Sequence, residues 1–322
     1  MKCISKSILI LLGLLTLTGC GSNKIEMPYD IDSSVSAYSF ASNDPGRVAD
    51  SFASDLCVVS ADVSEGTEVD MSMAAAAGLF DVTNCNTVYA KNIHKQVYPA
   101  SLTKVMTALL AMKYSKMDDV LTASDNVLIT ESGAQLVGFK PGDTMTMEQA
   151  LHGLLMYSGN DAGVVIAEHI SGSVEEFAKL MNEEALKLGA TNTSFQNPHG
   201  LSDDNHYTTA YDLYLIFNEA MKYEKFKEII HMNTYTSTYH DKEGNEKELD
   251  FSTTNQYLAG TISSPENVSV IGGKTGTTNA AGACLILLSK DSAGEPFISV
   301  VMQANDRDSL YVEMSDLLQE IK

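Results

Sequence analysis

Three short motifs in this chain combine side chains that together suit acyl transfer. The first is Ser101-Leu102-Thr103-Lys104. Residues three apart lie on one face of a helix, so a helix here would hold the hydroxyl and the amine within reach of each other. A serine hydroxyl is a weak nucleophile until a base takes its proton, and a lysine whose pKa is lowered by burial or by a second cation can be that base. The spacing therefore predicts a nucleophile, Ser101, and its base, Lys104, although the same pattern also occurs on exposed helix surfaces.

The second motif, Ser158-Gly159-Asn160, follows the apolar segment 147–157, where a helix gives way to a loop. Site residues are often found at such boundaries. The Ser158 hydroxyl could relay a proton to a leaving group, and the Asn160 amide could bind a substrate carbonyl or hold Lys104. The alternative is an ordinary helix terminus, where Gly and Asn are common.

The third motif, Lys274-Thr275-Gly276-Thr277, opens a β-rich run after a pair of glycines. Gly276 would let a ligand approach the strand closely. Lys274 supplies a cation, Thr275 a hydroxyl, and the strand backbone an N–H group for an oxyanion hole. The alternative is a glycine turn with an exposed lysine.

The elements that must position these motifs are predicted strands at both ends of the chain and predicted helices between them. This order indicates one antiparallel sheet, closed by N- and C-terminal strands, with a helical insertion. Capping residues mark three of the helix starts: Thr146 with Gln149, Ser173 with Glu176, and Thr209 with Asp212. The predicted strands are 56–59, 78–82, 87–90, 268–272, 283–289 and 297–302; the helices are 101–114, 147–157, 161–170, 174–188, 209–223 and 310–321; and 241–249 is a charged loop.

The N-terminus has the pattern of a secretory signal. Lys2 and Lys6 precede an apolar run at 8–17, which is too short for an ordinary membrane span. Leu17-Thr18-Gly19-Cys20 resembles the bacterial lipobox, whose cysteine is acylated after cleavage; an ordinary signal with an incidental cysteine is the alternative. We therefore expect a signal peptide at 1–19, lipid on Cys20, a tether and N-terminal extension at 20–73, and a catalytic domain at 74–322.

The net charge and the cysteines limit which ligands and which disulfide bonds the chain can have. The chain carries 42 acidic and 21 basic residues, a net charge of -21, which disfavours binding to nucleic acid. No His or Cys spacing indicates a metal site, and we expect no cofactor. Cys57, Cys85 and Cys284 form either one disulfide and one free thiol or three free thiols; Cys57 with Cys85 is the preferred pair, because Cys284 lies in an apolar strand.

The order of the three motifs is the signature of penicillin-binding proteins and class A β-lactamases. The chain from about 74 to 322 resembles the serine-type D-alanyl-D-alanine carboxypeptidases, which are low-molecular-mass penicillin-binding proteins of peptidase family S11. The segments that carry this resemblance are 98–107 (YPASLTKVMT), 158–162 (SGNDA), 197–201 (NPHGL) and 206–212 (HYTTAYD).

The resemblance implies an α/β (α+β) fold of the β-lactamase/transpeptidase type, with an antiparallel sheet flanked by helices and an all-helical subdomain inserted at about 101–265. It implies Ser101, Lys104, Ser158 and Asn160 as catalytic residues and Lys274, Thr275, Gly276 and Thr277 as substrate-binding residues. The expected substrates are peptidoglycan stem peptides, and β-lactams are the expected inhibitors. We expect the protein at the extracytoplasmic face of the membrane, held by the lipid on Cys20.

The chain departs from the family pattern in places. Leu310 stands where the family has a basic residue that assists the substrate carboxylate, and the nearby Arg307 is either its substitute or a surface residue. The turn at 84–86 reads Asn-Cys-Asn where the family has Gly, and Asn tolerates left-handed geometry. The family often adds a β-rich domain and a C-terminal amphipathic anchor, whose place we expect the lipid to take.

Three other functions remain open. A D,D-endopeptidase would use the same mechanism on cross-links. A class A β-lactamase would need a deacylating glutamate in an ExxLN pattern, and residues 183–187 (EEALK) lack the Asn. An inactive wall-binding lipoprotein could share the fold without activity.

Overall fold

The computed structural model describes residues 53–64 and 69–322, which belong to one compact unit, Ala53–Lys322. The predicted signal peptide and Cys20 lie outside the described residues. No helix in the described part of the chain has the length and apolar character to cross a membrane.

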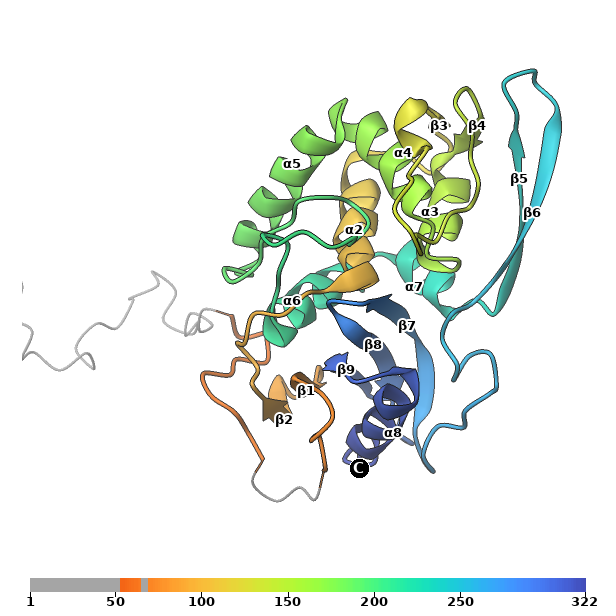
Figure 1. Ribbon diagram of the computed structural model, residues 1–322. Helices are drawn as coiled ribbons and strands as arrows, with labels where there is room; N and C mark the ends of the chain where they lie inside the picture. Colours follow the sequence, from red (N-terminus) through yellow and green to blue (C-terminus); the bar gives the residue numbers. More distant parts are fainter. Residues whose placement is uncertain (1–52, 65–68) are drawn as a thin grey trace, which may run out of the picture. The chain divides into compact units, whose positions relative to one another are not determined.

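The centre of the unit is an antiparallel five-stranded sheet (Figure 1). Its strand order is β2-β1-β9-β8-β7, so β1 pairs with β9, the last strand in the sequence, and β2 and β7 form the edges. The strands are β1 (Ala76–Asp81), β2 (Asn86–Lys91), β7 (Ser269–Thr278), β8 (Gly282–Lys290) and β9 (Pro296–Ala304).

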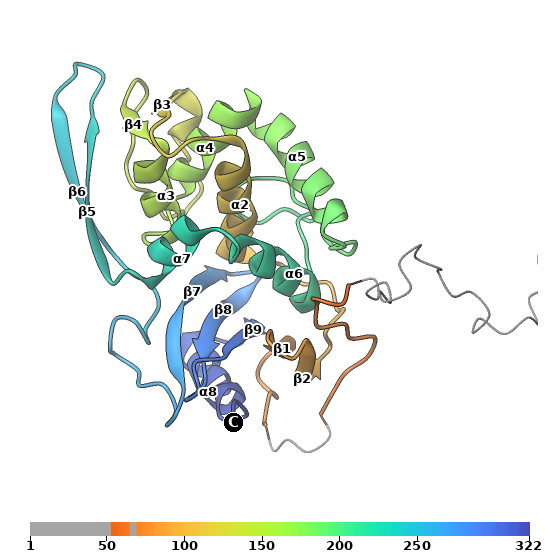
Figure 2. The same ribbon diagram turned by 180° about the vertical axis from the view of Figure 1, so that it is seen from behind.

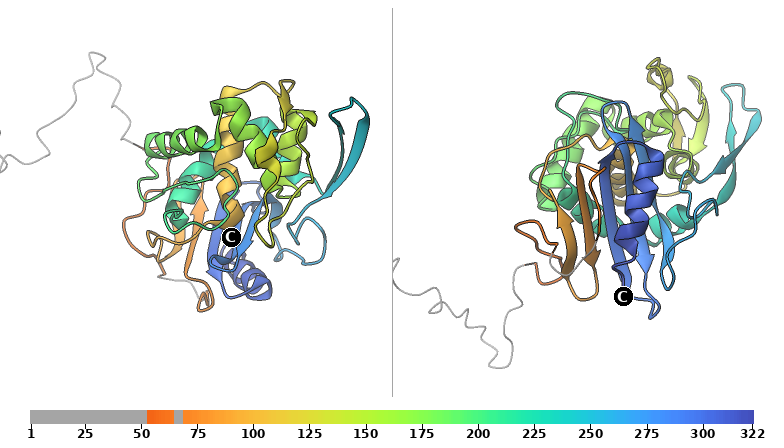
Figure 3. Two further views of the ribbon diagram at one scale, coloured as in Figure 1. Left: turned by 45° about the horizontal axis from the view of Figure 1, so that its top comes forward. Right: turned by 60° about the horizontal axis from the view of Figure 1, so that its bottom comes forward.

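Both faces of the sheet are covered, and the strand sequences explain why. In β8, Ala283, Leu285 and Leu287 pack with helix α8 (Arg307–Leu318), whereas Cys284, Ile286 and Leu288 pack with the helices of the insertion. Successive side chains of a strand alternate between faces, so a strand buried on both sides reads as a continuous apolar run. Figure 3 shows α8 lying along one face, and Figure 2 shows α6 (Ala210–Ala220) and α7 (Glu224–His231) against the other.

The insertion between β2 and β7 is mainly helical. The predicted caps are present: Thr146 and Gln149 form a reciprocal capping box, and the hydroxyls of Ser173 and Thr209 each accept a backbone N–H three residues on. Besides α6 and α7, the insertion contains the helices η2 (Ala100–Thr103), α2 (Lys104–Tyr114), η3 (Asp125–Val127), α3 (Met147–Leu155), α4 (Asn160–Ser171) and α5 (Val174–Lys187).

The predicted fold class is confirmed, but the insertion is not entirely helical. It also carries a four-stranded antiparallel sheet of order β3-β4-β5-β6. The segment predicted as the charged loop 241–249 is largely the turn and second strand of a hairpin, and this second strand is mostly exposed and so carries many charges. The four strands are β3 (Val120–Thr122), β4 (Thr144–Thr146), β5 (Thr234–His240) and β6 (Glu246–Ser252).

Two smaller predictions are corrected, and one open alternative is decided. Residues 56–59 form no strand, and nearby only Val63 makes a bridge, to Ala90. In the β1–β2 turn the left-handed residue is Cys85, with φ of 51°, rather than an asparagine. Of the two alternatives left open for the cysteines, the structure has three free thiols, Cys57, Cys85 and Cys284, and no Cys57–Cys85 disulfide.

Candidate active site

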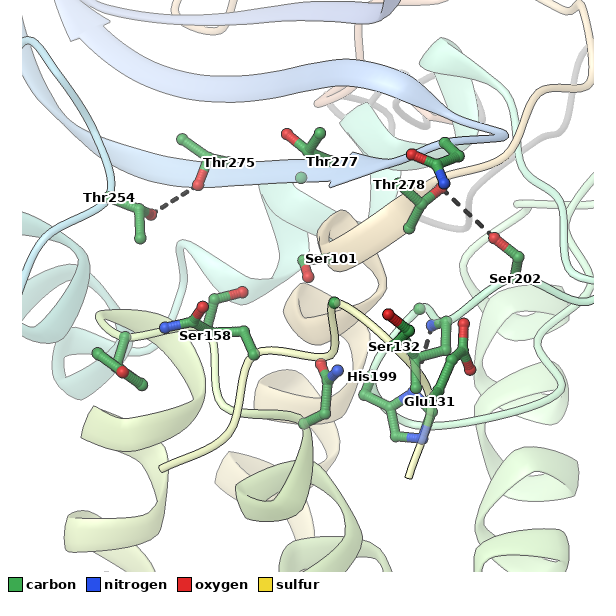
Figure 4. Close-up of a pocket in the computed structure, with 18 of the residues that line it drawn as sticks. Ser101, Glu131, Ser132, Ser158, His199, Ser202, Thr254, Thr275, Thr277 and Thr278 are labelled. Atoms are coloured by element: carbon green, nitrogen blue, oxygen red, sulfur yellow. Dashed lines mark hydrogen bonds between the residues drawn. The ribbon is translucent and has the colours of Figure 1, made fainter. Parts of the chain in front are cut away.

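The three motifs meet in one pocket of about 700 Å³ between β7 and the ends of the inserted helices (Figure 4). Ser101 lies at its centre, Ser158 and Asn160 line the side formed by the insertion, and Thr275, Gly276 and Thr277 line the side formed by β7. Lys104 and Lys274 lie behind these lining residues, fully buried. The pocket therefore collects residues from parts of the sequence more than 150 positions apart.

Ser101 and Lys104 occupy the start of the long central helix. Ser101 belongs to the 3₁₀ turn η2, and Lys104 is the first residue of α2. Lys104 Nζ lies 2.8 Å from Ser101 Oγ, 2.7 Å from Asn160 Oδ1 and 2.6 Å from the His199 carbonyl oxygen. Two of these partners only accept hydrogen bonds, whereas the serine hydroxyl can also donate. A neutral Lys104 amine can thus give its two N–H groups to Asn160 and His199 and turn its lone pair towards the Ser101 hydroxyl.

The surroundings of Lys104 favour that neutral form. Burial lowers the pKa of Lys104 well below its ordinary value, and the nearby cation Lys274 lowers it further. The carboxylate of Asp161 opposes these effects but is the smallest contribution. Lys104 is therefore suited to accept a proton from Ser101.

Lys274 and Ser158 form a second hydroxyl–amine pair in the same pocket. Lys274 Nζ donates to Ser158 Oγ at 2.9 Å and to the Thr275 carbonyl at 2.8 Å. Burial lowers the pKa of Lys274 to about 7, so both its charged and its neutral form are accessible near neutral pH. This pair can give or take a proton through the Ser158 hydroxyl.

The backbone beside both serines is strained. Ala100, which precedes the nucleophile candidate, has φ of 47°, and Ser158 itself has φ of 68°. Non-glycine residues rarely adopt this region, and such strain concentrates at functional sites. At Ala100 and Ser158 the fold therefore maintains an unfavourable backbone in order to aim the two hydroxyls.

Strand β7 passes very close to the nucleophile segment. A Cβ atom on Gly276 would lie 3.0 Å from Ser101 N and 3.2 Å from Leu102 N, so only glycine fits there without displacement of backbone. Thr275 Oγ1 is 2.6 Å from Thr254 Oγ1, which fixes the Thr275 hydroxyl at the pocket wall. Because β7 is an edge strand, an extended ligand could pair with it along the pocket.

Two contributions to the site were not predicted from the sequence. The buried carboxylate of Asp161 accepts N–H groups from Val137, Gly138 and Phe139, and so holds the loop whose earlier residues, including Glu131, line the pocket. His199 provides the carbonyl that binds Lys104. Asp161 follows the second motif directly, which was the available signal; the contact of the His199 backbone depends on tertiary structure.

The structure also distinguishes the two positions considered for the family's basic residue, 307 and 310. Arg307 lines the pocket, whereas Leu310 is buried in the core under α8. Glu183, which has the glutamate position in the segment considered as a β-lactamase motif, lies on α5 and is exposed. It is not among the residues that line the pocket. Among the residues described, no group of three or more His, Cys, Asp or Glu could hold a metal ion.

Comparisons with known proteins agree with this architecture. The sequence model of peptidase family S11, described as D-alanyl-D-alanine carboxypeptidase, matches residues 63–306. The D-alanyl-D-alanine carboxypeptidase DacF of Bacillus subtilis is 38% identical over 223 residues, which are 67% of this chain and 54% of DacF. DacC of Escherichia coli is 32% identical over 249 residues, 74% of this chain and 59% of DacC. The chain thus spans somewhat more than half the length of these relatives.

Solved structures show the same fold. The crystal structure of the Streptomyces K15 DD-transpeptidase has a TM-score of 0.72 and 25% identity, covering 78% of this chain and 98% of that one. A penicillin-binding protein homologue from Mycobacterium tuberculosis has a TM-score of 0.69 and 26% identity, covering 80% of this chain and 94% of that one.

Proposed function

The chain belongs to the D-alanyl-D-alanine carboxypeptidase family, and we propose that it removes the terminal D-alanine of peptidoglycan stem peptides through an ester on Ser101. The observation that carries this proposal is the contact of a buried lysine amine, Lys104 Nζ, with Ser101 Oγ at 2.8 Å. A second pair, Lys274 and Ser158, lies in the same pocket and can serve the leaving group.

In acylation the neutral Lys104 amine takes the proton of Ser101, and Ser101 Oγ forms a bond to the carbonyl carbon of the penultimate D-alanine. The carbonyl oxygen becomes an oxyanion, which accepts hydrogen bonds from the backbone N–H groups of Ser101 and Thr277. Such a donor is typically worth about 3–4 kcal/mol in the transition state.

The tetrahedral intermediate then breaks its carbon–nitrogen bond. The departing amine of the terminal D-alanine takes a proton from the Ser158 hydroxyl, which is replenished by Lys274 at 2.9 Å. Water next attacks the ester and gives a proton through Ser158 to Lys274, which lost one when the amine departed, while Ser101 Oγ leaves with the proton that Lys104 took. The acid product and free Ser101 complete the cycle.

Recognition of the substrate is assigned to the β7 side. Lys274, Thr275, Gly276 and Thr277 lie along an edge strand, to which an extended peptide can add. The terminal carboxylate would be met by the Thr275 hydroxyl and by the positive charges of Lys274 and Arg307. We thus propose that Arg307, which lines the pocket three residues before the expected position, takes the role of the family's basic residue.

The rival functions have less support. A β-lactamase would need a glutamate to activate water for deacylation, and Glu183, which has the glutamate position of the ExxLN pattern, is not among the residues that line the pocket. An inactive protein would have little reason to retain two buried lysines in contact with serine hydroxyls, since such burial opposes folding. A D,D-endopeptidase activity on cross-links would use the same groups, and the substrate preference decides it.

We also propose that the protein is anchored by lipid on Cys20 and works at the extracytoplasmic face of the membrane. The support is the sequence pattern of a basic start, an apolar run at 8–17 and Leu17-Thr18-Gly19-Cys20. Its substrate, the peptidoglycan stem peptide, is found on that side.

Intact-mass spectrometry after benzylpenicillin treatment tests the activity, with Ser101→Ala as the control. We expect a long-lived adduct in the wild type and none in the control, together with release of D-alanine from a D-Ala-D-Ala peptide. Loss of the adduct within seconds, with repeated penicillin turnover, would indicate a β-lactamase. Faster cleavage of cross-linked dimers than of pentapeptides would indicate an endopeptidase, and neither adduct nor release would indicate a binding protein.

A further inference from the structure

The peptide bond between Ala100 and Ser101 is held by a chain of buried hydrogen bonds. Thr103 Oγ1 donates to the Ala100 carbonyl oxygen at 2.8 Å, and the same Thr103 oxygen lies 2.9 Å from Nε2 of His206. Both side chains are buried, with exposed fractions of 0% for Thr103 and 1% for His206. These hydrogen bonds thus connect His206, about one hundred positions away in the sequence, to the backbone just before the nucleophile.

The direction of these bonds can be assigned. The backbone N–H of Gln196 donates to His206 Nδ1 at 3.2 Å, so Nδ1 carries a lone pair and the proton of the neutral ring is on Nε2. Nε2–H then donates to Thr103 Oγ1, whose only proton goes to the Ala100 carbonyl. Burial lowers the pKa of His206 to about 4, which keeps the ring neutral under ordinary conditions.

Holding this carbonyl also fixes the N–H of Ser101. The peptide unit is planar and trans, so its C=O and N–H point in opposite directions. The Ser101 N–H is one of the two donors of the proposed oxyanion hole, and it lies against β7, where Gly276 leaves room for it. On the other side, Gly200 packs directly on the Ala100 carbonyl, since a Cβ there would be 1.8 Å from that oxygen.

This restraint acts at the point where the backbone is strained. Ala100 has φ of 47°, which the surrounding structure has to maintain. His206 is itself fixed, because the next residues pair with other segments: Tyr207 with Ser194 and Thr208 with Val97.

We propose that His206 is a positioning residue that acts through Thr103 to orient the Ala100–Ser101 peptide, and thereby the Ser101 N–H of the oxyanion hole. This inference rests on the proposed function, which it deepens. His206 touches neither the substrate nor the reacting atoms, so its effect should fall on the transition state and not on substrate binding.

The kinetic test compares matched pairs of variants with a D-Ala-D-Ala peptide. His206→Leu removes the donor, whereas His206→Gln keeps an N–H for Thr103 and an oxygen for Gln196. Thr103→Val removes the hydroxyl, and Thr103→Ser keeps it. We expect His206→Leu and Thr103→Val to lower kcat by roughly 10–100-fold with KM within about twofold, less than complete loss of an oxyanion-hole donor. The Gln and Ser variants should stay within about threefold of the wild type.

Thermal unfolding checks that each variant folds. If His206→Leu does not fold, the comparison of Thr103→Val with Thr103→Ser decides the proposal. Equal loss in the leucine and glutamine variants, or kcat within twofold of the wild type in both Leu and Val variants, overturns the proposal. Crystal structures of Thr103→Val and Thr103→Ser give a readout that does not need activity. A rotated Ala100–Ser101 peptide in the valine variant alone supports the inference even if the wild type releases no D-alanine, which would refute only the proposed function. An unchanged peptide in the valine variant overturns it.

Discussion

Burial of Lys274 in the active site should lower the free energy of unfolding, and the size of this effect should depend on pH. The side chain is only 1% exposed, and burial lowers its pKa from an ordinary 10.5 to about 7. Between these two values the unfolded chain retains a proton that the folded protein has lost. Stability therefore rises with pH across this window, and the full penalty is present below pH 7.

The size of the effect follows from the shift. One pKa unit corresponds to about 1.4 kcal/mol, so Lys274 destabilises the fold by about 5 kcal/mol below pH 7. In Lys274→Met this penalty disappears, and the groups that lose a donor, Ser158 Oγ and the Thr275 carbonyl, cost about 1–3 kcal/mol each if they find no water. We expect the variant to be as stable as the wild type or more stable at pH 6.5, and to release no D-alanine.

Urea unfolding of the wild type and Lys274→Met between pH 6.5 and pH 10 is the assay. The advantage of the variant should shrink by about 1.4 kcal/mol for each pH unit between 7 and 10. Lys290→Met, on the exposed end of the adjacent strand β8, is the control and should show no such pH dependence. A flat difference between wild type and Lys274→Met would refute the reasoning, because Lys274 would then titrate alike in both states.

Three further predictions concern the other charged groups and the anchor. Lys104→Arg keeps a cation but loses the base, so intact-mass spectrometry should show no penicillin ester; acylation near the wild-type rate would remove Lys104 from that role. Arg307→Leu should raise KM for the peptide about tenfold with little change in kcat, because the substrate carboxylate loses one charged hydrogen bond. An unchanged KM would mean that Arg307 is a surface residue with no part in substrate binding. Mass spectrometry should find acylated Cys20 at the mature N-terminus, with Cys20→Ala lost from the membrane fraction; an unmodified N-terminus at another residue contradicts the anchor.

Sequence patterns predicted the elements best where local chemistry determines them. The cap at Thr146 and the apolar run of β8 are local signals, and both elements lie where expected. The hairpin β5–β6 was missed because its strand Glu246–Ser252 is mostly exposed, so its charges looked like those of a loop. Helix α7 (Glu224–His231) was not predicted, because its eight residues are too few to show a clear apolar period after the helix predicted at 209–223.

The site was predictable in composition but not in geometry. The three motifs name their residues from type and spacing, and the contact of Ser101 with Lys104 follows from helical periodicity. The contacts of Lys104 with Asn160 and of Lys274 with Ser158 join distant segments, so only the folded chain defines them. The buried state of both lysines, which sets their pKa values, is likewise a property of the packing.

The strained residues show why local reasoning ends at the site. Ala100 favours ordinary helix, and no local signal predicts its φ of 47°. The conformation exists because Thr103 and Gly200 fix its carbonyl while Gly276 admits the adjoining N–H. Each of these groups comes from a different part of the fold, and relaxing any one of them would let Ala100 return to a more favourable backbone. Since strain of this kind persists only where surrounding contacts over-determine it, the direction of the Ser101 N–H is a property of the assembled pocket and not of the nucleophile motif.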